Sequence, residues 1–479
     1  MVTMNRAASW LSPAAVAKVT GGRVVRTGRP ALRVVTDSRQ VGPDTLFVAL
    51  RGANFDGHDF VPGALRAGAA GVVVERPLEG RVLGGEGFVV RVADCGRALI
   101  DLGRSHRERR TARVVGITGS CGKTSTKDML GFALSGLVPT VFSPKSFNNH
   151  IGVPLSLLAI RPETEVAVVE IGTNAPGEIA GLTAVAQPDI GILTCVREAH
   201  LAGLGTLEGV AAEKAELLRG LRPGGVAIVN GDDPACAAIA ETLGGEVRRF
   251  RVQGEADWFA TDLRFHGLGT SFRLHGVRRG GGEWSVTLPR LGTHNVLNAM
   301  ASIAAAAELG VPVDDVVAAL AGLPASERRL EPKSVGGVQI FDDTYNMNPA
   351  SARAALHALS SIDTRGRKTV VFGEMKELGA RSDELHRELG AEVAVQGVDR
   401  LVVVGSGARP IVDGAIARGM SAEAVSHLDS SSAVLDVLLA ELEPGDLVLC
   451  KASRGVALDR LVDGLVRALG GDRDFGGSI

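Results

Sequence analysis

The sequence from Val114 to Asp128 reads Val-Val-Gly-Ile-Thr-Gly-Ser-Cys-Gly-Lys-Thr-Ser-Thr-Lys-Asp. An apolar run that predicts a strand leads into a turn of small residues, and a helical segment begins near Thr124. A strand, a glycine-rich turn and a helix start can together hold a phosphate chain, because backbone N–H groups and the positive end of the helix dipole meet at the turn. We interpret this stretch as a site for ATP or GTP.

The loop itself carries the chemistry that such a site needs. Its glycines let the backbone approach an anion, and Lys123 supplies a mobile cation. The hydroxyl of Thr124 or Ser125 can bind Mg²⁺. The usual pattern G-x-x-x-x-G-K-[ST] is not met, because its first glycine falls on Ile117, and the shorter form T-G-x-x-G-K-T is present instead. The alternative is a glycine-rich turn with an incidental lysine. The residues expected around the phosphates are Gly119, Ser120, Cys121, Gly122, Lys123, Thr124 and Ser125.

Length, charge and composition limit the function classes. The 479 residues are 45% hydrophobic, and this length suggests about three domains. A net charge of −2 gives no broad basic field for nucleic acid. No run of about 18 apolar residues occurs, and residues 1–22 lack the long apolar segment of a secretory leader, so we expect no membrane insertion. The composition is typical of a globular enzyme.

The cysteines indicate the compartment. They are five in number, widely scattered and without a C-x-x-C pair, which disfavours a disulfide framework or a zinc site. We therefore expect a cytoplasmic protein. The sequence does not fix the oligomeric state, and a monomer is our expectation.

Residues 1–107 contain short β-like runs that predict a small α/β domain. The first of them, residues 33–35, leads into Asp37-Ser38-Arg39. The Ser38 hydroxyl and the forked cation of Arg39 would then lie at one edge of the sheet, where they suit a sugar or a diphosphate. A turn with a surface ion pair explains the same residues equally well.

Residues 108–325 alternate strand and helix patterns, which predicts a mostly parallel sheet covered on both faces. The strand at residues 165–172 is apolar until Glu170. A carboxylate near the end of such a strand lies where α/β sheets gather ligands, so Glu170 is a candidate to bind or orient Mg²⁺. A solvated strand end is the alternative. We expect residues 245–290 to form an antiparallel excursion.

Two basic residues follow in this domain. His200 comes after the strand at residues 189–196, and Lys214 lies on a predicted helix at residues 207–221. Alone, a histidine here usually satisfies a turn, and a helical lysine near Glu216 is usually exposed. Whether His200 and Lys214 have a functional role depends on which residues lie next to them in the fold.

Asn295 and Asn298 are three residues apart at the start of an Ala-rich helix, and so they lie on one face. Amides there can bind a nucleobase or a ribose. Helix capping explains one of them equally well.

Residues 326–479 predict a third, Rossmann-like domain after a linker at residues 322–325. A strand ends in Asp343-Thr344-Tyr345-Asn346-Met347-Asn348-Pro349, and a helix is expected to start at Pro349 or Ala350. Further strands are expected at residues 369–372, 401–404 and 446–451.

With these motifs in place, the whole chain resembles the Mur ligases of peptidoglycan synthesis, in particular the branch that adds D-alanyl-D-alanine. Two segments favour that branch, residues 148–154 and residues 343–349, and the Asp-Asn-Pro-Arg signature of ligases that add meso-diaminopimelate is absent. The other segments that carry the resemblance are Asp37-Ser38-Arg39 with Gly52, residues 56–58, residues 118–124, Phe147, residues 170–174, residues 198–201, Lys214, residues 294–298 and Arg329.

The resemblance implies ATP-dependent peptide-bond formation through an acyl phosphate, with UDP-N-acetylmuramoyl-tripeptide and D-alanyl-D-alanine as substrates. It implies catalytic roles for Lys123, Glu170, His200, Lys214 and Arg329, with Mg²⁺ held by Thr124, Glu170, His200 and a Lys214 carbamylated by CO₂. It assigns the nucleotide further to Asn295, Asn298, Arg329, Asp343 and Tyr345. It assigns the substrates to Ser38, Arg39, Asn148, Asn149, Asn346, Asn348, Lys451 and Arg454.

Three other functions are weighed against this one. A P-loop switch or GTPase shares the loop, but no Asn-Lys-x-Asp guanine signature is present. A binding protein without activity is disfavoured because Lys123, Glu170, His200 and Lys214 are all present. Within the enzymes, another amide ligase of the same build remains, such as one that adds a different amino acid or adds glutamate to folate.

Overall fold

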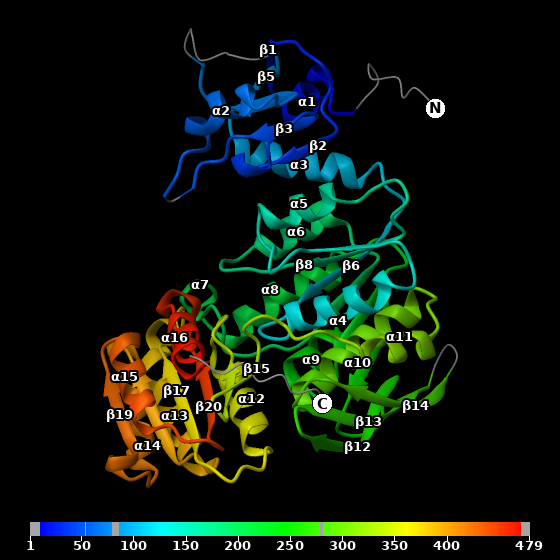
Figure 1. The fold of residues 1–479 in the computed structure, drawn as a ribbon. Helices are drawn as coiled ribbons and strands as arrows, with labels where there is room; N and C mark the ends of the chain where they lie inside the picture. The colour runs from blue at the N-terminus through cyan, green and yellow to red at the C-terminus, as the bar shows by residue number, and fades with distance from the viewer. Residues whose placement is uncertain (1–9, 53, 79–85, 278–280, 471–479) are drawn as a thin grey trace.

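The computed structural model describes residues 10–52, 54–78, 86–277 and 281–470. It consists of three regions, and within the described residues their sheets have five, nine and six strands. The N-terminal region, in blue, is stacked on one end of the central region, and the C-terminal region, in yellow to red, lies beside the other end (Figure 1). This mixed α/β architecture confirms the predicted fold class. The sheets fall within residues 1–107, 108–325 and 326–479, and those boundaries remain a prediction.

The N-terminal region is a small sheet with helices packed against it. Its elements are α1 (Pro13–Thr20), β1 (Arg23–Arg26), β2 (Arg33–Val35), β3 (Thr45–Val48), α2 (Val61–Arg66), β4 (Gly71–Val74), β5 (Phe88–Arg91) and α3 (Cys95–Arg107). The strand order is β1-β5-β4-β3-β2, in which β1 is antiparallel to β5 and the other neighbours are parallel. Every residue of β3 and β4 is buried, as expected for central strands of a mostly parallel sheet.

The central region is built on the strand order β14-β13-β12-β11-β10-β9-β6-β8-β7. Its first elements are β6 (Arg113–Thr118), α4 (Lys123–Ser135), β7 (Thr140–Phe142), α5 (Gly152–Leu158), β8 (Val166–Glu170), α6 (Glu178–Ala186), β9 (Ile190–Leu193), α7 (Leu201–Leu204) and α8 (Leu207–Arg219). Its later elements are β10 (Val226–Asn230), α9 (Pro234–Glu241), β11 (Glu246–Arg251), β12 (Trp258–His266), β13 (Gly269–Gly276), β14 (Gly282–Leu288), α10 (Thr293–Glu308) and α11 (Val313–Leu320).

One expectation for the central region is wrong in part. Residues 245–290 were expected to be antiparallel throughout, but β11 is parallel to both β10 and β12. Only β12, β13 and β14 form the antiparallel meander. The physical reason is that alternation of apolar and polar residues marks a half-buried strand whichever direction its neighbour runs.

The C-terminal region has the strand order β15-β16-β20-β17-β18-β19, in which only the β15–β16 pair is antiparallel. Its elements are β15 (Glu331–Val335), β16 (Val338–Asp342), α12 (Pro349–Ser360), β17 (Lys368–Gly373), α13 (Ser382–Val395), β18 (Arg400–Val404), α14 (Arg409–Ala417), β19 (Val425–Leu428), α15 (Ser431–Glu441), β20 (Leu447–Lys451) and α16 (Asp459–Gly470). The predicted helix start at Pro349 is confirmed, and Asn348 caps that helix.

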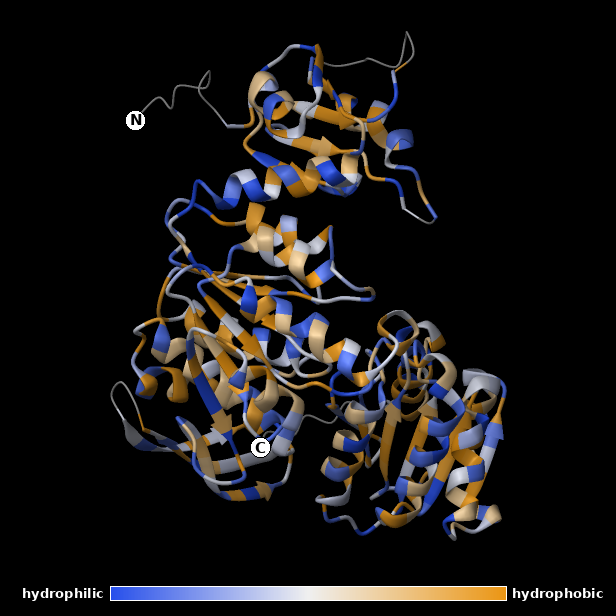
Figure 2. Cartoon of the chain, turned by 180° about the vertical axis from the view of Figure 1, so that it is seen from behind, coloured by the Kyte–Doolittle hydropathy of each residue, from blue (hydrophilic) through white to orange (hydrophobic). Residues whose placement is uncertain are grey.

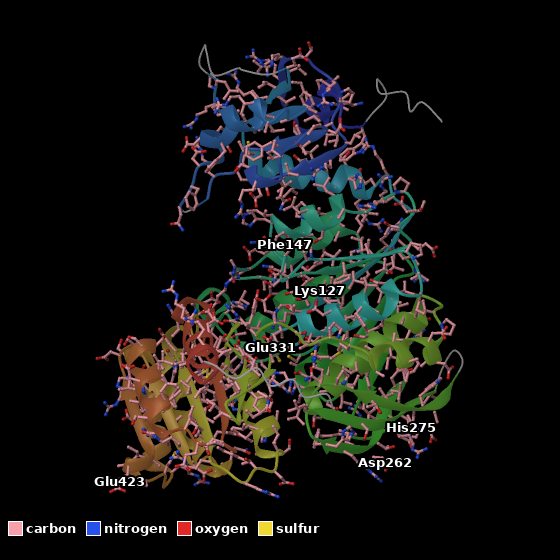
Figure 3. The ribbon with its side chains drawn as sticks, viewed as in Figure 1. Lys127, Phe147, Asp262, His275, Glu331 and Glu423 are labelled. Carbon is pink, nitrogen blue, oxygen red and sulfur yellow. The ribbon has the colours of Figure 1, made fainter. Side chains whose placement is uncertain are left out.

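The hydrophobic residues lie mainly in the strands and on the inner faces of the helices (Figure 2). The N-terminal and central regions meet where α3 packs against α5, and a Cβ atom added to Gly103 would lie 2.8 Å from Pro154 Cβ. Asp262 and His275, on the β12–β13 hairpin, lie far from this contact, and Glu423 lies at the outer edge of the C-terminal region (Figure 3). Across the described part of the chain, no helix has both the length and the apolar character that a membrane span requires.

Candidate active site

The phosphate loop joins β6 to α4 at the carboxyl end of the central strands, where α/β sheets gather ligands. Gly122 lies directly before α4 with φ of 83°, and a Cβ atom there would stand 2.5 Å from Asn298 Oδ1. Only glycine meets both demands. The Lys123 ammonium donates a 2.6 Å hydrogen bond to the carbonyl oxygen of Gly119, so the loop folds around its own lysine. The predicted arrangement of strand, loop and helix is confirmed.

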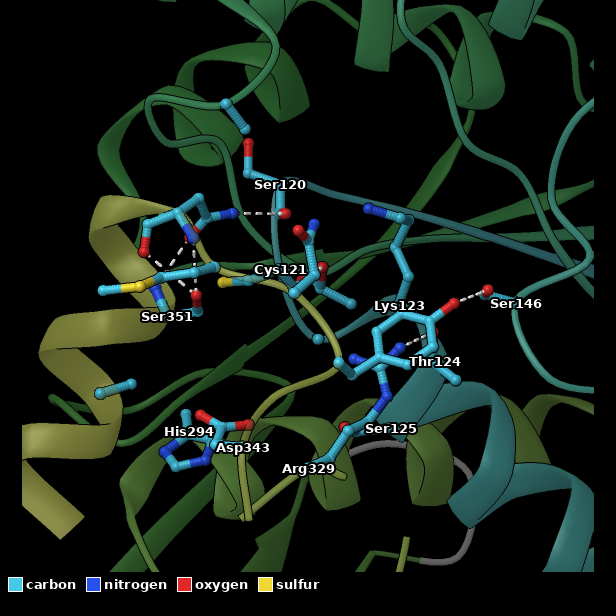
Figure 4. Close-up of a pocket in the computed structure, with 18 of the residues that line it drawn as sticks. Ser120, Cys121, Lys123, Thr124, Ser125, Ser146, His294, Arg329, Asp343 and Ser351 are labelled. Carbon is cyan, nitrogen blue, oxygen red and sulfur yellow. Dashed lines mark hydrogen bonds between the residues drawn. The ribbon is translucent and has the colours of Figure 1, made fainter. Parts of the chain in front are cut away.

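A buried carboxylate faces the start of α4. Glu170 ends β8, and its oxygens accept hydrogen bonds from the Thr124 hydroxyl at 2.8 Å and from the Asn148 amide at 2.7 Å. The Arg329 guanidinium donates to the same Thr124 hydroxyl at 2.9 Å (Figure 4). Since Glu170 is only 1% exposed, it is not the solvated strand end of the alternative interpretation.

The oxygens of Thr124 and Glu170 are the kind of donors that Mg²⁺ binds, together with phosphate oxygens and water. These donors fit that cation. Within the described residues, no group of three or more His, Cys, Asp or Glu side chains gathers as a metal site. A cation here would therefore depend on the phosphates of a nucleotide for much of its coordination.

His200 lies between β9 and α7 with a left-handed backbone, and its Nδ1 atom is 2.5 Å from an oxygen of Glu377 in the C-terminal region. Burial lowers the pKa of His200, and the positive charge of Lys123 lowers it further. The histidine is therefore part of the contact between two regions, which its sequence context did not predict.

Lys214 is fully buried on α8, so the alternative interpretation, an exposed helical lysine near Glu216, is wrong. Among the described residues, no hydrogen-bond or ion-pair partner meets its ammonium. Glu213 accepts hydrogen bonds from Gly177 N and Ile179 N, while Glu216 pairs with Arg219. Burial lowers the pKa of Lys214 to about 7, and the nearby Lys123 charge contributes.

The two asparagines of α10 lie behind the phosphate loop. Asn295 donates to the carbonyl oxygen of Leu291 at 2.9 Å, and Asn298 accepts from the Thr126 hydroxyl at 3.2 Å. Neither caps α10, because its N-cap is Gly292 without a side-chain hydrogen bond. The capping alternative is therefore wrong.

Residues of the C-terminal region complete the cavity. The Tyr345 hydroxyl is hydrogen-bonded to Ser146, and the Arg329 guanidinium stacks 4.0 Å from the centre of the Tyr345 ring. The Asp343 carboxylate pairs with Lys451 at 2.6 Å, and Lys451 also donates to the carbonyl oxygen of Asn346 at 2.9 Å. Burial raises the pKa of Asp343, although the Lys451 ammonium opposes that shift.

Most of these residues, but not Lys214, line one cavity of about 480 Å³. The loop residues from Ser120 to Ser125 form one side, and Figure 4 shows Arg329 of the C-terminal region close to Thr124 and Ser125. The other expected site residues on its surface are Asn148, Glu170, His200, Asn295, Asn298, Arg329, Asp343, Tyr345, Asn346, Asn348, Lys451 and Arg454. A cavity of this size with a phosphate loop suits a nucleotide.

Three family models match the chain. They are the Mur ligase middle domain over residues 117–306, the Mur ligase glutamate ligase domain over residues 328–454, and the catalytic domain of the Mur ligase family over residues 33–94. These matches span more than half of the chain. The chain belongs to the Mur ligase family.

Individual relatives are similar over nearly the whole length. The UDP-N-acetylmuramoyl-tripeptide–D-alanyl-D-alanine ligase of Bacillus subtilis is 36% identical over 440 residues, which are 91% of this Mur ligase and 93% of that protein. A crystal structure of MurF from Acinetobacter baumannii has a TM-score of 0.85 at 33% identity, covering 95% and 98% of the two chains. MurF ligase from Thermotoga maritima, solved in complex with ADP, has a TM-score of 0.78 at 30% identity, covering 91% and 97%.

A second cavity of about 400 Å³ adjoins the first in this Mur ligase. It lies between α3, with Arg97, Asp101 and Arg104, and α6. The two cavities share the lining residues Lys123, Asn148, Asn174 and His200. Asn149 lines the second cavity only, and its side chain also accepts hydrogen bonds from Ile151 N and Gly152 N.

Some expected site residues lie elsewhere in this Mur ligase. Ser38 and Arg39 are in the N-terminal region and line neither cavity. Arg39 is exposed and pairs with Asp37 at 2.7 Å, which is the surface ion pair of the alternative interpretation. Lys214 also lines neither cavity, and its side chain is buried.

Sequence reasoning missed several residues of the site. Glu377 pairs with His200, and Ser146 bonds with Tyr345. Arg290 and Lys376 also line the first cavity, as does His294, which the sequence had indicated only as part of the resemblance. One signal was available for Glu377, which follows the predicted strand of residues 369–372 at its ligand-binding end. Nothing local singled out Ser146.

Proposed function

We propose that this Mur ligase joins D-alanyl-D-alanine to UDP-N-acetylmuramoyl-tripeptide with ATP, in the synthesis of peptidoglycan precursors. Relatives that match at least nine-tenths of the chain carry that activity in their names. The observation that carries the proposal is the cavity in which a phosphate loop, a buried carboxylate and residues of a second region face one another. ATP use is supported by the ADP complex of a related ligase.

The reaction has two steps. An oxygen of the peptide carboxylate attacks the γ-phosphorus of ATP, ADP leaves, and an acyl phosphate remains. The amine of D-alanyl-D-alanine then attacks the acyl carbon, the C–O bond breaks, and phosphate leaves as the amide forms. Activation is required because a carboxylate at neutral pH has no adequate leaving group. Lys123 and Arg329 supply positive charge where negative charge gathers on the transferred phosphoryl group.

Thr124, Glu170, His200 and a modified Lys214 would hold Mg²⁺ in this proposal. When bound, the cation neutralises phosphate charge and orients the γ-phosphoryl group. Thr124 and Glu170 are hydrogen-bonded to each other, so the oxygens of both would be available to one cation. His200 keeps its orientation through Glu377.

We also propose that Lys214 reacts with CO₂ to form a carbamate. Only a neutral amine attacks CO₂, and a pKa of about 7 makes a large part of Lys214 neutral near physiological pH. The product carries a negative charge where an ammonium would repel the cation. The buried side chain without a described partner is the observation that favours this proposal.

The substrates would occupy the two joined cavities. Asn295, Asn298, Asp343 and Tyr345 are proposed to surround the adenosine part. The peptide would run through the second cavity past Asn148 and Asn149, from a nucleotide-sugar bound by Ser38 and Arg39. D-alanyl-D-alanine would be bound by Asn346, Asn348, Lys451 and Arg454.

We take the domains as residues 1–107, 108–325 and 326–479, one for each ligand. The enzyme is proposed to act in the cytoplasm, because ATP and the free thiols of its five cysteines suit that compartment. We also propose that it acts as a monomer.

The test is phosphate release from ATP. It should be negligible with ATP alone and appear when UDP-N-acetylmuramoyl-tripeptide and D-alanyl-D-alanine are both supplied. Omission of either substrate is the matched control, and L-glutamate with a folate substrate tests the other amide ligase. Fast ATP hydrolysis that neither substrate changes would refute the proposal.

A further inference from the structure

Two cysteines lie side by side in the wall of the nucleotide cavity. Cys121 belongs to the phosphate loop, and Cys195 follows β9. Their Sγ atoms are 3.0 Å apart, and both residues line the cavity of about 480 Å³. Neither side chain takes part in the proposed ligase chemistry. The remaining cysteines, Cys95, Cys236 and Cys450, are fully buried in the cores.

The backbone holds this pair in register. Ser120 N donates to the carbonyl oxygen of Cys195 at 2.9 Å, and the Thr194 hydroxyl donates to the carbonyl oxygen of Cys121 at 2.5 Å. Arg197 N adds a hydrogen bond to the Ser120 hydroxyl at 2.9 Å. A disulfide has its sulfur atoms about 2 Å apart. The two thiols therefore need to move by only about 1 Å, without a rearrangement of the two segments.

The surroundings favour reaction of Cys195. The hydrogen bond between the two sulfur atoms lowers the pKa of Cys195 to about 7, with further help from the Cys121 backbone N–H. The same contact, together with burial, raises the pKa of Cys121. A thiolate is the nucleophile in thiol oxidation, and this one opens on a cavity that admits a small oxidant.

We propose that Cys121 and Cys195 form a reversible oxidation site, at which a peroxide converts the two thiols into a disulfide that disables the phosphate loop. The Cys195 thiolate attacks one oxygen of hydrogen peroxide, the O–O bond breaks, hydroxide leaves, and a sulfenic acid forms. The sulfur of Cys121 then attacks this sulfur, the S–O bond breaks, and water leaves. Overall, two thiols are oxidised and one peroxide is reduced to two water molecules.

The effect on the loop follows from its geometry. The Cys121 backbone N–H points at Cys195 Sγ, at 3.4 Å, and is one of the N–H groups that a phosphate loop offers to an anion. A disulfide would hold the Cys121 backbone N–H against the end of β9 and restrict the movement of the phosphate loop. The oxidised protein should therefore bind ATP and ADP weakly, and bound nucleotide should slow the oxidation. This consequence rests on the proposed nucleotide site, whereas the disulfide itself does not.

The experiment treats the reduced full chain with hydrogen peroxide. Peptide mapping without reductant should find Cys121 joined to Cys195, and calorimetry should show that most ADP binding is lost and then restored by dithiothreitol. Preincubation with ADP should slow the cross-link. Cys195→Ser should retain its ADP affinity after peroxide treatment. The control variant Cys95→Ala, which changes a cysteine of the N-terminal region, should lose ADP affinity after peroxide, as the unaltered protein does.

Two outcomes overturn the proposal. One is a peroxide-treated protein in which mapping finds no link between Cys121 and Cys195. The other is a complete link that leaves ADP affinity unchanged, which removes the effect on the loop. If the reduced protein binds no ADP, the proposed nucleotide site fails, and mapping of the link still decides whether the oxidation site exists.

Discussion

Lys214 shows how one residue can change meaning between sequence and structure. In the sequence it is one of several charged residues on a helix, but in the fold it is 1% exposed. The carboxylates beside it bind other groups, since Glu213 holds two backbone N–H groups and Glu216 holds Arg219. A buried cation without compensation is costly, so the residue is expected to be neutral or modified.

Lys214→Ala should be nearly inactive, and a small carboxylate such as acetate or formate should restore part of the rate by taking the anionic position. Steady-state phosphate release at equal ionic strength, with chloride as the comparison salt, measures this rescue. Glu216→Ala, on the exposed side of the same helix, is the matched control and should keep its activity without any response to acetate. A Lys214→Ala variant that retains most of its activity would contradict the carbamate.

The lowered pKa of Lys214 also predicts a dependence of stability on pH. The pKa falls from an ordinary value of 10.5 to about 7 on folding, so the unfolded chain binds more protons between these pH values. Stability therefore rises with pH across this window, and the penalty, a few kcal/mol, is complete below about pH 7. In CO₂-free buffer, Lys214→Met should have a higher Tm than the unaltered protein at pH 6, and the gap should narrow toward pH 10.

Thermal unfolding followed by fluorescence from pH 6 to pH 10 measures that gap. Lys127→Met is the matched control, because Lys127 is equally buried but donates to the carbonyl oxygens of Ser143 and Lys145. That variant should lose stability at every pH. Bicarbonate at pH 8 should raise the Tm of the unaltered protein and leave Lys214→Met unchanged. If the Tm difference between Lys214→Met and the unaltered protein were constant from pH 6 to pH 10, burial would not disfavour the charged form of Lys214.

At the scale of elements, the phosphate loop depends on the glycine before α4. Gly122→Ala would place a methyl group 2.5 Å from Asn298 Oδ1 and force alanine into a left-handed conformation, which costs about 1 kcal/mol. We expect a lower Tm and at least about a tenfold loss of ADP affinity, since the loop must shift away from α10. Calorimetry with ADP and thermal unfolding measure the two effects.

Gly136→Ala is the control for that variant, because it lies at the other end of α4 with a negative φ and nothing within 4 Å of the added Cβ atom. It should bind ADP normally and be equally stable or slightly more stable. Equal ADP affinity in both variants would mean that the loop tolerates a side chain at its tightest point.

The sequence predicted most elements, and the misses have a physical cause. The strand expected at residues 401–404 is β18 (Arg400–Val404), and the helix expected at residues 207–221 is α8 (Leu207–Arg219), since hydrophobic periodicity is a local property. The direction of β11 was missed because it depends on which strand lies beside it. Asn348 lines the first cavity, and the structure adds two contacts that its sequence did not indicate, because its side chain caps α12 and donates to the carbonyl oxygen of Ser120.

At the scale of the whole molecule, the proposed function assigns each ligand to a different region. The first cavity, the proposed nucleotide site, is built by the central and C-terminal regions, which meet through Arg329 on Thr124, Asn348 on Ser120 and Glu377 on His200. The N-terminal region joins the central region through α3 and α5, at the second cavity. Ligands bound to the two outer regions should therefore respond to different substitutions.

Arg39→Ala tests this division. Arg39 lies in the N-terminal region outside both cavities, so its loss should raise the KM for the nucleotide-sugar and leave the KM for ATP nearly unchanged. Arg29→Ala is the matched control, because it removes a similar exposed pair with Asp44 from the same region and should change neither constant. Steady-state kinetics with each substrate varied in turn decide the matter, and a selective defect in ATP would refute the assignment.

The sequence alone determined the phosphate loop, the alternation of strands and helices, and the membership of a ligase family, because these rest on glycine conformation, hydrophobic period and short motifs. The tertiary structure decided which side chains meet. The burial of Lys214, the contact of Cys121 with Cys195 and the bond between Ser146 and Tyr345 join segments far apart in the chain. Such contacts depend on how sheets and regions pack, and no local pattern encodes that packing.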